Sequence, residues 1–187
     1  MTRIRIIFAV AATVSLLAAL APQSALGASA TVTGSVNAGT LSISTSATPS
    51  FSVTLDGTDK TGSYTVPTTV TDATGSGAGW NLTITSTQFT TGGGSPKTLA
   101  TSASSLTGVT SSCAGGSTCT NPTNSVTYPV AVPAGSTPPT AVKYFNAALN
   151  TGAGQFTNTP TVSVSVPANT YAGSYSSTLT LAAVSGP

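Results

Sequence analysis

Charged side chains are scarce in this chain, and several residues on which enzymes rely are missing. Only 4% of the 187 residues are charged, and there is no histidine. Glutamate is also absent, and the only arginines are Arg3 and Arg5. These absences remove the usual general base near neutral pH, the paired glutamates of many hydrolases and the bidentate clamp for anions. The sequence therefore predicts that the protein is not an enzyme, with no catalytic residues and no cofactor.

A serine nucleophile activated by a lysine is the one catalytic alternative that this inventory leaves, with Lys97 and Lys143 as the available bases. Serine is so abundant here that a match to this pattern carries no information. Measurable hydrolysis that a single Ser or Lys substitution abolished would be needed to support it.

Carboxylates are equally few, and all three belong to aspartates: Asp56, Asp59 and Asp72. They are weak candidates for a Ca²⁺ site, because Ca²⁺ prefers oxygen ligands. Aspartates outside an acidic loop motif more often cap turns. The sequence therefore predicts no metal.

Basic residues do not form a cluster beyond the N-terminus, where only Lys60, Lys97 and Lys143 remain. They balance the three aspartates, so the rest of the chain is formally neutral. Since a nucleic-acid site needs basic groups to neutralise phosphates, nucleic acid is excluded as an expected partner.

Long hydrophobic runs are absent except for one, from Ile6 to Leu20. It follows Arg3 and Arg5 and precedes Pro22 and small residues that suit cleavage after residue 27 or 30, which is typical of a secretory signal peptide. The run is short for a membrane span of about 20 residues. We therefore expect residues 1–27 to be a cleaved signal peptide and the mature protein to be extracellular, with no membrane span.

The remaining residues, 28–187, alternate between apolar and polar side chains, which predicts strands with one buried face. The alternating segments are Val32–Val36, Leu41–Ile43, Phe51–Leu55, Tyr64–Val70, Trp80–Ile84, Val126–Val132, Val162–Val166 and Leu179–Val184. Short strands separated by turn residues predict an all-β protein with a single antiparallel β-sandwich or barrel. The apolar content argues against disorder outside the loops.

Two segments depart from this alternation. Residues 90–124, rich in Gly, Ser and Thr, are expected to form a long surface loop or a weakly paired hairpin. Val142–Leu149 is the one place where a short helix is expected. Within the loop, Cys113 and Cys119 are predicted to form a local disulfide, because an exported protein meets an oxidising environment. A redox or metal pair would need the Cys-x-x-Cys spacing or a histidine, and neither is present.

One stretch carries a resemblance to a known family. A strand, a Gly-rich turn opened by Asp72, and Gly79-Trp80-Asn81-Leu82 on the next strand resemble the WxL domain family of Gram-positive cell-surface proteins. Residues 39–43, Gln88-Phe89 and residues 167–180 match the family's opening strand, the end of its Trp strand and its closing segment. The resemblance implies non-covalent attachment to peptidoglycan or to a surface partner. The family usually repeats Trp-x-Leu in the last strand, where this chain has Leu181 and Ala183.

Four residues are therefore candidates for contact with a ligand or the wall. Alternation places Trp80 and Leu82 on one face, where they either pack in the core or form part of a glycan-facing surface. Tyr171 and Tyr175 share one side of an extended chain and either pack or stack on sugars.

The sequence thus predicts a secreted, non-catalytic protein at the cell surface, resembling WxL domains, that binds wall polymer or a surface protein. The alternative is structural: a subunit of an extracellular fibre, in which Thr31–Val36 completes the sheet of a neighbouring copy by strand addition.

Overall fold

The computed structural model describes residues 28–187, so the predicted signal peptide, residues 1–27, lies outside the described residues. Residues 28–35 form no strand and are exposed. The expected strand at Val32–Val36 is therefore wrong for the isolated chain: both valines are solvent-exposed, at 92% and 101%. Alternation of apolar and polar side chains indicates that a segment can adopt an extended backbone. The segment forms a strand only when its backbone groups pair with those of another strand.

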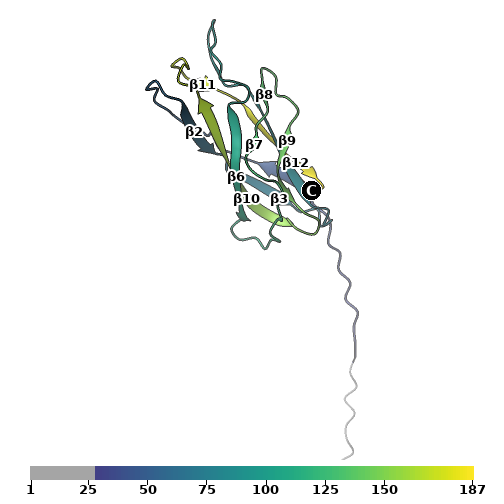
Figure 1. Cartoon of the computed structure of the whole chain (residues 1–187). Coiled ribbons are helices and arrows are strands. Elements are labelled where there is room, and N and C mark those ends of the chain that lie inside the picture. Colours follow the sequence, from purple (N-terminus) through teal and green to yellow (C-terminus); the bar gives the residue numbers. More distant parts are fainter. Residues whose placement is uncertain (1–27) are drawn as a thin grey trace, which may run out of the picture. The chain divides into compact units, whose positions relative to one another are not determined.

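The remainder, residues 36–187, contains two sheets, antiparallel except for one short parallel pair, and a two-stranded ladder (Figure 1). The first sheet has six strands: β1 (Leu41–Ser44), β2 (Lys60–Thr65), β3 (Thr68–Asp72), β6 (Ser104–Cys113), β7 (Val130–Ala131) and β10 (Gly154–Val166). The long strand β10 is its centre. It pairs with β3 and β2 in succession along one edge and with β6 along the other.

The second sheet is built around β4 (Trp80–Thr87). On one side it pairs with β12 (Leu179–Ser185), and on the other with β9 (Val142–Ala147) and, in parallel, with the short β8 (Ala134–Gly135). The ladder of β5 (Thr90–Thr91) and β11 (Tyr175–Ser176) continues the pairing of β4 with β12.

Apolar side chains from both sheets meet in one core, which the period-two pattern of the strands predicts. Residues 28–187 contain no helix, and hence none long and apolar enough to cross a membrane. The predicted antiparallel sandwich is therefore confirmed. Its fully buried apolar side chains are Val70, Trp80, Leu82, Ile84, Leu106, Tyr144, Ala147, Phe156, Val162 and Val164.

The expected helix at Val142–Leu149 is wrong, because this segment forms strand β9. Its register with β4 shifts between Leu82 and Thr83, and the shift buries both Tyr144 and Phe145. A β-bulge turns two consecutive residues inward, which breaks the alternation by which a strand is recognised in sequence.

The expected loop over residues 90–124 is also wrong in part, since residues 104–113 form β6 and pair with β10. Only Ser104 and Leu106 of this strand are buried. A strand with so few apolar side chains leaves little hydrophobic signal, although its backbone pairs as fully as any other.

Two further segments are less regular than their alternation suggests. Phe51, Val53 and Leu55 are half-buried, whereas Ser52 and Thr54 are exposed, yet the segment forms no ladder with any strand. Of Val126–Val132, only Val130–Ala131 is a strand.

Candidate functional site

Trp80, the residue at the centre of the family resemblance, is completely buried at the start of β4. Its indole N–H donates a hydrogen bond of 2.8 Å to the backbone carbonyl of Gly152. Its ring lies 5.8 Å from the ring of Phe145 and 6.1 Å from that of Phe156, measured between centroids. The side chain therefore joins the two sheets and fixes the loop that follows β9.

Glycines allow this arrangement because the loop and the Gly-rich turn approach each other closely. Gly79 has a φ of 70°, and a Cβ there would collide with the carbonyl oxygen of Ala147. Gly152 has a φ of 75°, and a Cβ there would lie 2.6 Å from the indole nitrogen of Trp80. Positive φ and the lack of space both require glycine at these two positions.

Leu82 is likewise buried, between the sheets, so neither it nor Trp80 offers exposed surface to a ligand. The positions where the family repeats its motif, Leu181 and Ala183, pair with Ile84 and Leu82 and are half-buried against the core. In this arrangement the Trp-x-Leu segment holds the sandwich together.

Tyr171 and Tyr175, in contrast, lie together at the surface. The Tyr175 hydroxyl donates a hydrogen bond of 3.0 Å to the carbonyl of Tyr171, and the Tyr171 side chain is 64% exposed. The Lys97 ammonium lies 4.5 Å from the centroid of the Tyr171 ring, which is within the range of a cation–π contact. The structure thus brings the two predicted tyrosines together and adds a lysine.

Both tyrosines line a groove of about 860 Å³, called here the aromatic groove. Its lining comes from the extended segment 49–55, from residues 170–177, and from single side chains beneath them. These are Tyr64, Phe89, Leu99, Val166 and Leu179. No charged residue lines it, so its surface is apolar and aromatic with serine and threonine hydroxyls at the edges.

Aromatic rings pack against one another within this groove. The ring of Phe51 stacks on that of Tyr64 at 6.2 Å and meets Phe89 edge-on at 5.7 Å. Burial raises the pKa of Tyr64 to about 12, because the phenolate is poorly solvated there. Sequence reasoning missed this cluster, although the alternation at Phe51 and the apolar residue after the Trp strand were both visible.

The three aspartates that were weak Ca²⁺ candidates each serve a separate local structure. Asp56 forms an ion pair of 2.7 Å with Lys60, which lowers the pKa of its carboxyl, and it also accepts hydrogen bonds from Thr58. Asp59 accepts the backbone N–H of Ala168. Asp72 accepts both the N–H and the hydroxyl of Thr74. Across residues 28–187, no three acidic, His or Cys residues gather in the way that a metal site requires.

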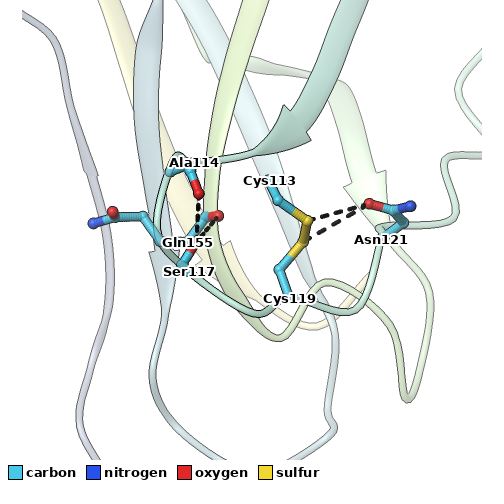
Figure 2. The surroundings of a disulfide bond; sticks show 6 residues. All are labelled: Cys113, Ala114, Ser117, Cys119, Asn121 and Gln155. Atoms are coloured by element: carbon cyan, nitrogen blue, oxygen red, sulfur yellow. Dashed lines mark hydrogen bonds between the residues drawn. A yellow bond between two sulfur atoms is a disulfide. The ribbon is translucent and has the colours of Figure 1, made fainter.

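Cys113 and Cys119 form the predicted disulfide, which closes the turn between β6 and the strandless segment that follows (Figure 2). The Asn121 side-chain oxygen lies 3.7 Å and 3.8 Å from the two sulfurs. Within the turn, the Ser117 hydroxyl donates to the carbonyls of Ala114 and Gln155. The bridge closes the turn, and the hydrogen bond from Ser117 to Gln155 ties the turn to the beginning of β10.

Comparison with known protein families gives one match. The family profile described as "WxL domain surface cell wall-binding" matches residues 29–187, which is most of the chain. Searches of curated proteins and of solved structures gave no match.

Proposed function

The chain belongs to the WxL family of surface cell wall-binding domains, and from this premise we propose that it attaches non-covalently to peptidoglycan through the aromatic groove. Membership places the protein outside the cell, at the cell surface and associated with the wall. The choice of peptidoglycan and of the groove is our proposal.

The exposed ring of Tyr171 is the observation that carries the proposal. Sugar rings stack on aromatic faces through their C–H groups, and a tyrosine offers such a face together with a hydroxyl. Tyr171 is one of the few large apolar residues exposed in residues 28–187, and it lies at the edge of a concave surface, which ligands prefer. Serine and threonine hydroxyls beside it suit the hydroxyl groups of a glycan.

We propose further that binding occurs without turnover. The chain has no histidine and no glutamate, and the groove is lined by no charged side chain. General acid–base chemistry at a glycosidic bond requires a pair of carboxyl groups in most families, and the groove holds none. Isolated peptidoglycan incubated with the protein should release no soluble fragments; release of fragments would refute this part of the proposal.

We also propose that residues 1–27 are a signal peptide that directs export and is then removed. The mature protein would consist of one β domain, residues 28–187. Mass spectrometry of the native secreted protein should find an N-terminus at Ala28 or Thr31. An intact leader on wall-bound protein would contradict it.

Sedimentation with purified peptidoglycan tests the wall site. Tyr171→Ala should reduce the bound fraction, with a loss of about 1–3 kcal/mol if its stacking resembles other aromatic platforms. Leu149→Ala is the matched control, because Leu149 is also 64% exposed but does not line the groove. Equal binding by both variants would remove Tyr171 from the site, and no sedimentation of the unmodified protein would refute peptidoglycan binding.

A further inference from the structure

The two long walls of the aromatic groove carry backbone groups without backbone partners. In the described part of the chain, residues 49–55 and 171–174 form no backbone–backbone hydrogen bond and belong to no ladder. Nearly all backbone groups in folded proteins find a partner or remain open to water. These walls are therefore free strand edges on either side of a concavity.

The first wall already has the form of a strand. Phe51, Val53 and Leu55 face inward, with Ser52 and Thr54 exposed between them, which is the period of an extended chain. It carries no charged residue of the kind that protects edge strands from pairing with another chain. An added strand would satisfy its N–H and C=O groups and cover the aromatic side chains beneath.

A segment with the matching character exists in the same protein. Residues 31–36, Thr-Val-Thr-Gly-Ser-Val, alternate in the same way, carry no charge and form no strand. Val32 and Val36 are almost wholly exposed, at 92% and 101%. Their burial in an apolar groove would be favourable, because it would remove apolar surface from water.

The length of the chain decides which copy supplies this segment. Gly39 is fixed by a hydrogen bond of 2.8 Å from its N–H to the carbonyl of Ala73, directly after β3. Asp72 pairs with Gly154, at the beginning of β10, whereas Val166, at the other end of β10, lines the groove. Twelve residues of strand separate the two ends by about 40 Å, and the three residues from Gly39 to Val36 span about 10 Å. A chain therefore cannot place Val36 in its own groove.

We propose that the aromatic groove accepts residues 31–36 of a second copy of this chain as an added β-strand. Donor segment and acceptor groove lie on different parts of one chain, so each copy carries both, and the association can continue from one copy to the next. Copies would join into a linear array along the cell surface. The added strand and a glycan would occupy the same groove, so one copy binds one or the other, and the two proposals are tested by separate measurements.

Mixed disulfide trapping tests the inference directly. Ser35→Cys in one preparation of the mature protein is mixed with Ser52→Cys in another, under mild oxidation. Both positions are exposed, and both side chains would lie on the outer face of the added ladder, because Ser35 alternates with Val36 and Ser52 with Phe51 and Val53. The mixture should give a covalent dimer, whereas Ser35→Cys mixed with Thr140→Cys, an exposed position outside the groove, should not.

Sedimentation velocity across a concentration series measures self-association without any cross-link. It therefore shows whether the trapped dimer reflects association or accidental cross-linking. Val32→Asp combined with Val36→Asp should weaken self-association at least about tenfold, because a charge would enter an apolar groove. Val184→Asp, at another exposed valine, is the control.

Three results would overturn the inference: a mature protein that stays monomeric throughout, equal trapping with Thr140→Cys, or a monomeric internal bridge in the chain carrying both Ser35→Cys and Ser52→Cys. Trapping that persists when Tyr171→Ala has abolished wall binding would leave the two proposals separate. Wall binding without trapping would refute strand addition alone.

Discussion

The indole N–H of Trp80 donates a hydrogen bond to the carbonyl of Gly152, which lies 72 residues further along the chain. The bond joins the first residue of β4 to the loop that precedes β10, so a single side chain connects the two sheets of the sandwich. This relationship explains why the Trp of the family motif is buried. The contribution of this hydrogen bond to the free energy of unfolding can be measured separately from wall binding.

Trp80→Phe should lower the free energy of unfolding by about 1–3 kcal/mol, because the buried Gly152 carbonyl loses its donor while much of the apolar contact is kept. Trp80→Ala should cost about 3–5 kcal/mol, since a cavity is added. Urea denaturation measures both. Folded Trp80→Phe should sediment with peptidoglycan as the unmodified protein does, and a folded variant that no longer binds would show that Trp80 reaches the ligand.

Gly152→Ala should destabilise the protein more than Gly116→Ala. Both glycines have a positive φ, 75° and 81°, so each substitution introduces backbone strain of about 1–2 kcal/mol. At Gly152 the new Cβ also meets Trp80 and Ala147, whereas at Gly116 nothing lies within 4 Å. The difference between the two free energies of unfolding therefore isolates the steric contact, and equal values would mean that the loop moves away from Trp80 at little cost.

Removal of the disulfide by Cys113→Ser with Cys119→Ser should lower the free energy of unfolding by about 2 kcal/mol, as loop-closure entropy predicts for so short a loop. Wall binding should not change. The bridge lies at the Phe156 end of β10, and the aromatic groove at the Val166 end. Reduction of the unmodified protein is the parallel measurement, and loss of binding by folded, reduced protein would move the wall site to the loop.

Stability should vary little between about pH 5 and pH 9, because the chain has no histidine, the side chain that ordinarily titrates in this range. At alkaline pH it should fall. Burial raises the pKa of Tyr64 from 10.0 to about 12, so its contribution is fully present below pH 10 and is lost as the pH rises through 12. Burial also raises the pKa of Tyr128 and that of Tyr144.

Chemical denaturation at a series of pH values, together with the ultraviolet absorbance of tyrosinate, checks this expectation. Tyr64→Phe should show a shallower alkaline loss of stability than the unmodified protein. If most of the stability were lost between pH 5 and pH 8, the buried tyrosines would not be the groups responsible.

Alternation identified Trp80–Ile84 and Val162–Val166, which are strands with one apolar face, but it also marked Phe51–Leu55, which forms no ladder. It failed where the physics of the strand was different. The bulge in β9 buries Tyr144 and Phe145 together, and β6 pairs through its backbone while carrying mainly Ser and Thr. Neither feature leaves a periodic signal, because register shifts and backbone pairing are set by the neighbouring strand.

The candidate site, like the fold, was only partly predictable from the sequence. The sequence singled out Tyr171 and Tyr175, but it did not connect them with Phe51, which is more than a hundred residues away and lines the same groove. Nor did it decide between a core and a ligand role for Trp80. Both questions concern which distant segments meet in space.

By itself, the sequence determined the all-β class, the disulfide, the family and the poverty in groups that carry out acid–base chemistry, because composition, local periodicity and spacing encode each of these. Only the tertiary structure decided that Trp80 lies in the core, that an aromatic groove exists and that its walls lack backbone partners. Those properties arise from contacts between residues far apart in the chain, and such contacts depend on how both sheets close around one core.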